Sequence, residues 1–124
     1  MKALSVYEPW ASLVVDGIKP VENRNWRYSP KYRGPLLIHA AKHFDYEGWQ
    51  WIQKAMNMIL PDPGSYKRGG IIGRVDFTRV VLTHDSPWFF GPLGFVFENP
   101  VSLPFTPYRG RQGLFEVPDY GGKL

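Results

Sequence analysis

The sequence predicts an α+β domain in which a small, partly closed β-barrel of about five to six strands is flanked by two main helices. The chain has 124 residues, of which 44% are hydrophobic, and this is enough for one core. Short apolar segments bounded by many of the 13 glycines and 12 prolines alternate with two helical patterns. We therefore expect residues 1–124 to form a single domain.

The first helix is predicted directly after a short strand at residues 6–7. Pro9 suits the first position of a helix, because its missing N–H removes no hydrogen bond there. Apolar residues then recur at helical spacing up to Gly17, which can adopt the left-handed conformation that ends a helix. This pattern places Trp10 on the apolar face of the helix.

The remaining strands are predicted from alternation and from the glycines and prolines that bound them. Residues 20–27 alternate with a period of two, so three side chains share one face. These are Glu22, Arg24 and Trp26. Further strands are expected at residues 36–41, 71–82, 95–98 and 113–117.

A second helix is predicted from Asp45, which can cap its N-terminus, to about Leu60. Its polar residues form a single stripe, and apolar residues cover the rest of the circumference. The apolar residues are Trp49, Trp51, Ile52, Ala55, Met56, Met58 and Ile59. We therefore expect a widely buried core helix, followed by a mobile basic loop at residues 61–70.

The net charge of +4, with a sequence pI near 9.4, favours anionic partners if the charges cluster. Residues 19–33 contain five basic side chains and one acidic side chain, so this segment alone carries a charge of +4. Trp26, Tyr28 and Tyr32 lie among these charges, and such a combination is typical of single-strand binding. A solvated basic surface without a ligand is the alternative interpretation.

Several function classes are excluded by what the sequence lacks. There is no cysteine, which excludes disulfides, thiol nucleophiles and zinc ribbons. No phosphate loop, dinucleotide fingerprint or serine-hydrolase elbow is present, and we predict neither a metal site nor a cofactor. No apolar run approaches the roughly 20 residues of a membrane span, so we expect a cytoplasmic protein without membrane contact.

Residues 17–24 concentrate the ionisable side chains Lys19, Glu22 and Arg24. On an open surface, Glu22 and Arg24 would form an ion pair worth about 0 to 1 kcal/mol. In a cleft, the lysine would serve as a base or electrostatic stabiliser, the carboxylate would accept hydrogen bonds from a base amine, and the arginine would bind phosphate. The spacing leaves both interpretations open.

Two isolated residues are further candidates. Asp76, in the strand expected at residues 71–82, is either a second functional carboxylate or an exposed acid. His39, in the strand expected at residues 36–41, either caps the core or projects into a cleft.

An ordered series of motifs spans nearly the whole chain. The motifs are Glu8-Pro9-Trp10-Ala11-Ser12-Leu13, Gly17-Ile18-Lys19, Glu22-x-Arg24-x-Trp26, Gly34-x-Leu36-Leu37-Ile38-His39-Ala40, Gly73-Arg74-Val75, Gly94-Phe95-Val96-Phe97-Glu98-Asn99 and Arg109-Gly110-Arg111-Gln112-Gly113-Leu114-Phe115. Together they resemble the signature of the ASCH domain, the activating-signal-cointegrator homology module. The resemblance implies a PUA-like fold with a cleft beside the first helix.

The resemblance also implies association with nucleic acids or nucleobases. Members of the family differ in activity, and one bacterial branch resembles an amidohydrolase that deacylates N4-acetylcytidine. Lys19 matches the lysine of that branch and Asp76 its glutamate, but Glu22 occupies the position of the threonine nucleophile. Glu8 likewise replaces a glutamine that is common in the family.

We therefore expect a module that binds single-stranded RNA or DNA, or a modified base, in a basic cleft. The expected binding residues are Trp10, Lys19, Glu22, Arg24, Trp26, Arg27, Arg33 and His39. The alternative is a small hydrolase that acts on a modified nucleoside or on RNA, with Lys19, Glu22 and Asp76 as its catalytic residues. A third hypothesis is a protein-docking domain that uses the aromatic residues 88–90.

Overall fold

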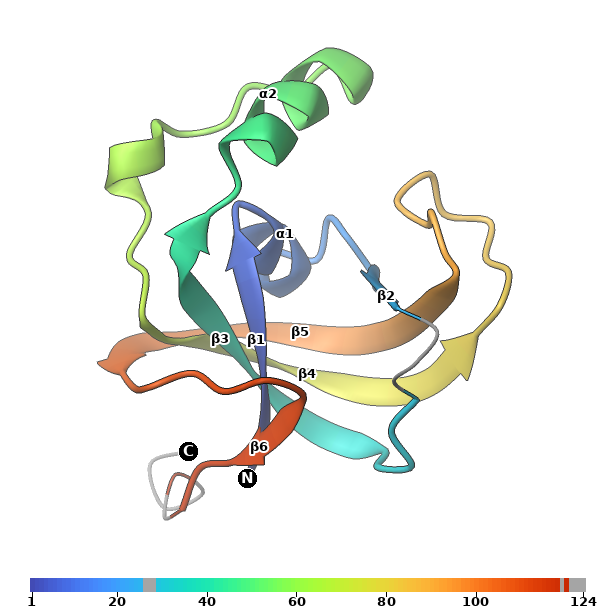
Figure 1. Cartoon of the computed structure of the whole chain (residues 1–124), viewed down its shortest axis with the longest axis vertical. Helices are drawn as coiled ribbons and strands as arrows, with labels where there is room; N and C mark the ends of the chain where they lie inside the picture. The colour runs from blue at the N-terminus through green and yellow to red at the C-terminus, as the bar shows by residue number, and fades with distance from the viewer. Residues whose placement is uncertain (26–28, 119, 121–124) are drawn as a thin grey trace.

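The computed structural model describes residues 1–25, 29–118 and 120, and Figure 1 shows a curved sheet accompanied by helices. The elements are β1 (Lys2–Glu8), α1 (Trp10–Val15), β2 (Val21–Arg24), β3 (Gly34–Phe44), α2 (Tyr46–Ala55), the 3₁₀ helix η1 (Pro63–Ser65), β4 (Gly70–Val81), β5 (Leu93–Pro107) and β6 (Leu114–Glu116). This confirms the predicted α+β class. Within the described ranges, every helix is too short or too polar to cross a membrane.

Within the described part of the chain, six strands form one sheet in the order β2-β5-β4-β3-β1-β6. The β1–β3 pair is parallel and the other pairs are antiparallel. The sheet is strongly twisted, so that β4 and β5 run across the direction of β1 in Figure 1. Among the described residues β2 and β6 remain as edges, so the predicted barrel is not confirmed.

Helix α1 covers the sheet through small and branched apolar residues. Ala11, Val14 and Val15 belong to the main core cluster, which also contains Phe77 and Phe95 of β4 and β5. The helix ends as predicted, with Gly17 in the left-handed conformation at a φ of +79°. The packing of α1 on the sheet therefore positions residues 16–20, which connect α1 to β2.

Helix α2 is shorter and more exposed than predicted. Asp45 caps it as expected, because its side chain accepts a hydrogen bond from Gly48 N at 2.9 Å. The helix ends at Ala55, near Asn57, which has a φ of +52°. Only Gly48 and Ile52 of α2 are buried, so the prediction of a widely buried helix reaching Leu60 was wrong. One helix face packs against the domain, and the other apolar residues remain partly or fully exposed.

Strand β5 is much longer than the predicted segment at residues 95–98. It runs from Leu93 to Pro107 and pairs with β4 from Gly94 to Pro107, with register shifts along the ladder. Strand β2 covers only residues 93–96 on its other side. Prolines 100 and 104 therefore lie where no strand among the described residues pairs with the second side of β5, which explains how a strand can contain them.

At Gly73 of β4 the sheet lies close to Val15 of α1. A methyl group built at this position would lie 2.5 Å from Val15 Cγ1 and 2.7 Å from the backbone oxygen of Val101. We predict that Gly73→Ala lowers the free energy of unfolding by about 1 to 3 kcal/mol, because it overpacks this contact. Urea denaturation measures the change. Gly64→Ala is the matched control, since nothing lies within 4 Å of a methyl group there, and an equal loss in both variants would contradict the prediction.

Candidate functional site

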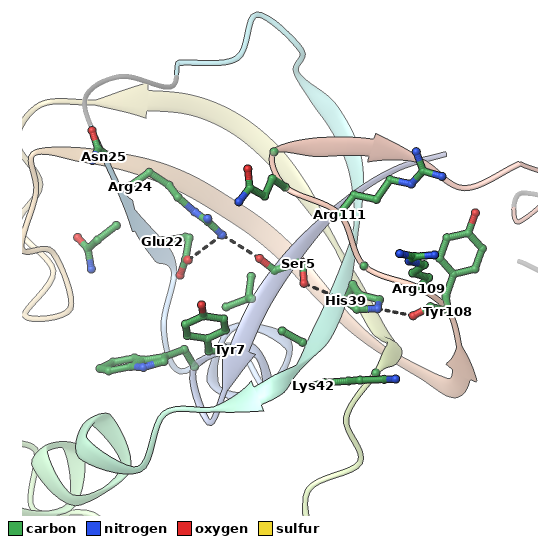
Figure 2. Close-up of a pocket in the computed structure, with 18 of the residues that line it drawn as sticks. Ser5, Tyr7, Glu22, Arg24, Asn25, His39, Lys42, Tyr108, Arg109 and Arg111 are labelled. Atoms are coloured by element: carbon green, nitrogen blue, oxygen red, sulfur yellow. Dashed lines mark hydrogen bonds and ion pairs between the residues drawn. The ribbon is translucent and has the colours of Figure 1, made fainter.

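A cavity of about 1630 Å³ opens between β1, β2, β3 and the connection from β5 to β6 (Figure 2). Its walls come from residues 5–7 of β1, Trp10, residues 22–25, His39 and residues 107–113. Ala41, Lys42 and Gly69 complete the lining at the far end of β3. The cavity therefore depends on contacts between segments that are distant in the sequence.

Glu22 lies between two cations at one side of this cavity. Lys19 Nζ donates to Glu22 Oε1 at 2.9 Å and to the Val21 carbonyl oxygen at 2.7 Å. Arg24 Nη2 lies 3.2 Å from Glu22 Oε2 and donates to the Ser5 carbonyl oxygen at 3.1 Å, as Figure 2 shows. The ion cluster Lys19–Glu22–Arg24 is thus a charged unit that connects β2 to β1.

The surroundings of Glu22 decide its protonation state. Burial by itself would raise the pKa of this carboxyl group, but the charges of Lys19 and Arg24 and the hydrogen bond from Lys19 outweigh burial and lower it. Lys19 is only 2% exposed, and its ammonium group lies 5.6 Å from the centroid of the Trp10 ring. Glu22 is therefore an ionised hydrogen-bond acceptor in the cavity lining. Lys19 is not in the lining, but it stabilises the charge of Glu22 from the buried side.

His39 is held by both ring nitrogens. Nε2 lies 2.6 Å from the carbonyl oxygen of Tyr108, which only accepts, so Nε2 carries a proton. Nδ1 lies 3.0 Å from Ser5 Oγ, and in the neutral ring it accepts a hydrogen bond from the Ser5 hydroxyl group (Figure 2). Gly110 packs on this pair, since a methyl group there would lie 2.6 Å from His39 Cε1. Both predicted interpretations of His39 apply, because it is buried and also lines the cavity.

The sequence interpretation missed three cations that line the cavity. Lys42, Arg109 and Arg111 are exposed, and none of them forms an ion pair with a described residue. With Arg24 they give four basic side chains against one acidic side chain, Glu22, among the described lining residues. The arginines on either side of Gly110 were visible in the sequence, but their position depends on pairing between β6 and β1 at the other end of the chain.

The predicted site residues that the structure describes divide into two groups. Trp10, Glu22, Arg24 and His39 line the cavity, and Lys19 joins them through Glu22. The other two described residues, Arg33 and Asp76, are absent from the lining. Trp26 and Arg27 lie outside the described residues.

Arg33 and Asp76 make contacts near the opposite end of the β3–β4 pair. The Arg33 guanidinium group lies 4.8 Å from the ring centroid of Phe77 and donates to the carbonyl oxygens of Pro30 and Tyr32. Asp76 pairs with Pro35 across the sheet and accepts from Asn99 Nδ2 at 2.8 Å. No group of three or more metal-binding side chains occurs in the part of the chain that the structure describes.

These features define a small α+β domain with a basic cavity beside its first helix. The family model described as the ASCH domain matches residues 4–91, and the chain belongs to this family, which confirms the resemblance. Human activating signal cointegrator 1 is 41% identical over 133 aligned residues, which cover 92% of this chain and 22% of that protein. The mouse protein of the same name is 38% identical and covers 59% of this chain. This chain therefore spans about a fifth or less of the length of these relatives.

Solved ASCH structures from Zymomonas mobilis share the fold. A tyrosine-to-phenylalanine mutant of that protein superposes with a TM-score of 0.62 at 13% identity, and covers 98% of this chain and 93% of its own. A structure of ASCH from the same organism gives a TM-score of 0.59, also at 13% identity, with 98% and 90% coverage. At this identity the likeness establishes the architecture alone.

The ion cluster yields a prediction about stability and pH. Lys19→Met should lower the free energy of unfolding by about 3 to 5 kcal/mol at neutral pH, because it removes one of the two cations beside a buried carboxylate. The lowered pKa of Glu22 stabilises the wild type above 4.5, the ordinary pKa of the group, and this contribution is lost as pH falls below 4.5. Without Lys19 the pKa of Glu22 rises, so Glu22 takes up a proton more readily in the folded state.

Urea denaturation at several pH values measures this effect. The difference in stability between the wild type and Lys19→Met should shrink as the pH falls through 4.5. Lys54→Met, which alters an exposed lysine in the last turn of α2, is the matched control and should change stability little. A difference that stays constant with pH would show that Glu22 does not depend on Lys19 for its charge.

Proposed function

We propose that the cavity binds single-stranded nucleic acid, with phosphates at its basic end and a base beside Glu22. The observation that carries this proposal is the excess of cations in the lining, of which three form no ion pair with a described residue. Unpaired arginine and lysine side chains in a concave surface attract a polyanion and bind its phosphates. Membership of the ASCH family is consistent with this function.

The two sides of the cavity suit two parts of a nucleotide. In Figure 2, Arg109 and Arg111 lie on one side of Ser5 and His39, and Glu22 and Tyr7 lie on the other. The arginines are suited to phosphates, and the ionised Glu22 carboxylate accepts hydrogen bonds from an amino group of a base. The exposed ring of Tyr7 offers a surface for stacking.

A salt titration tests the phosphate role. The affinity of the wild type for a fluorescein-labelled oligouridylate should fall steeply as salt increases. The double variant Arg109→Ala, Arg111→Ala should bind more weakly, and its slope of log affinity against log salt should be shallower by about 0.7 for each phosphate that the variant no longer binds.

Arg79→Ala is the matched control for this titration, because Arg79 is exposed on β4 and is not in the cavity lining. It should keep the slope and the affinity of the wild type. A flat salt response of the wild type would overturn the proposed binding of phosphates.

The second candidate function is hydrolysis of a modified nucleoside or of RNA. The observation that favours it is the chain of contacts from Ser5 Oγ to His39 Nδ1 and from His39 Nε2 to the Tyr108 carbonyl oxygen. A hydroxyl group beside an imidazole whose second nitrogen is fixed has the arrangement of an activated nucleophile. In this scheme Ser5 joins Glu22 and Lys19 as a candidate, whereas Asp76 lies outside the cavity lining.

If the chain is a hydrolase that uses Ser5, product formation should require the Ser5 hydroxyl group. Wild type and Ser5→Ala would each be incubated with acylated nucleosides and short RNAs, and the products analysed by mass spectrometry. If the chain is a hydrolase of this type, only the wild type should form product, because the alanine variant lacks the nucleophile. A wild type that forms no product but binds the same RNAs would leave binding as the function.

A further inference from the structure

An aromatic surface lies beside the basic cavity, on α2 and on the loop before β5. Trp51 is 42% exposed and Phe90 is 55% exposed, although both are large apolar side chains. Their ring centroids are 5.3 Å apart at an interplanar angle of 82°. Two adjacent rings that stay open to solvent form a surface on which a flat partner can stack.

This surface is continuous with the cavity through Trp10. Trp10 lines the cavity, and its ring centroid lies 6.4 Å from that of Trp51. Trp10 is fixed in turn, because its Nε1 donates to Asp45 Oδ2 at 2.9 Å. A row of rings therefore leads from the cavity wall to Trp51 and then to Phe90.

The loop that carries Phe90 is fixed by a residue of the cavity wall. Asn23 Oδ1 accepts hydrogen bonds from Phe90 N at 2.7 Å and from Gly91 N at 3.1 Å. Asn23 Nδ2 donates to the Trp88 carbonyl oxygen at 2.9 Å, and the Trp88 ring is buried in a core cluster. These bonds and the buried Trp88 ring hold the loop in place, so that the exposed Phe90 ring lies against Trp51.

We propose that Trp51 and Phe90 form a stacking platform for unpaired bases of a nucleic-acid strand whose phosphates lie in the basic cavity. This inference rests on the proposed function, and it adds a second site to it. The surrounding residues indicate the kind of partner. Three cations that form no ion pair with a described residue require an anionic partner. The adjacent row of rings requires that this partner also carries flat apolar groups. Single-stranded nucleic acid meets both requirements.

Variants that remove each ring test the platform. Trp51→Ala and Phe90→Ala should each weaken binding of an oligouridylate by about tenfold or more, because each removes a surface on which a base stacks. The slope of log affinity against log salt should stay unchanged, since both variants keep every cation that binds phosphate. Trp51→Phe keeps a ring and should bind nearly as well as the wild type.

An abasic strand with the same number of phosphates is the decisive probe. The wild type should bind it more weakly than the oligouridylate, and Trp51→Ala should bind it as the wild type does. Tyr46→Ala is the matched control, because it removes an exposed ring of the same helix that packs on Phe44 rather than on the platform. Urea denaturation of each variant verifies that the fold is intact.

The outcomes separate the platform from the proposed function. Steep, salt-dependent binding by the wild type with no weakening in Trp51→Ala and Phe90→Ala would overturn the platform and leave the cavity as the binding site. An equal weakening on the abasic strand would also overturn it, since the rings would then act without bases. Failure of the wild type to bind any strand would overturn both.

Discussion

The contact on which the cavity depends is the Arg24 guanidinium group, which binds Glu22 on its own strand and the Ser5 carbonyl oxygen on β1. Among the described strands β2 is an edge of the sheet, and three strands separate it from β1 in the order of pairing. Backbone pairing therefore does not join the two strands, and a side chain does so instead. The twist of the sheet brings them close enough for this bridge, which turns an open sheet into a concave site.

The ion cluster also explains how charge is divided in the site. Glu22 is neutralised by Lys19 and Arg24, so its carboxylate does not repel an anionic ligand as a free acid would. The cations contributed by β3 and by the connection from β5 to β6 then dominate the field in the cavity. On the same strand, Val21 enters the core and Asn23 holds the loop that carries Phe90. A strand of four residues thus supports the core, the cavity and the aromatic surface.

Local signals predicted local features well. The end of α1 at Gly17, the cap at Asp45 and the proximity of Glu22 and Arg24 all followed from short-range rules of backbone conformation and side-chain alternation. The position of Arg109 and Arg111 was not predictable, because it depends on pairing across more than 100 residues. The exposure of Trp51 was missed for a related reason, since an apolar pattern does not tell which neighbours are available to cover a helix.

Gly110 has a consequence for how this sequence can diverge. Its backbone lies so close to the imidazole of His39 that any larger residue at this position would collide with the ring. A smaller residue at position 39 would relieve the collision, but it would also remove the contacts with Ser5 and with the Tyr108 carbonyl oxygen. Positions 39 and 110 should therefore change together in related chains. ASCH sequences with both His39 and Gly110 would share this contact, whereas sequences without the pair would build this wall of the cavity in another way.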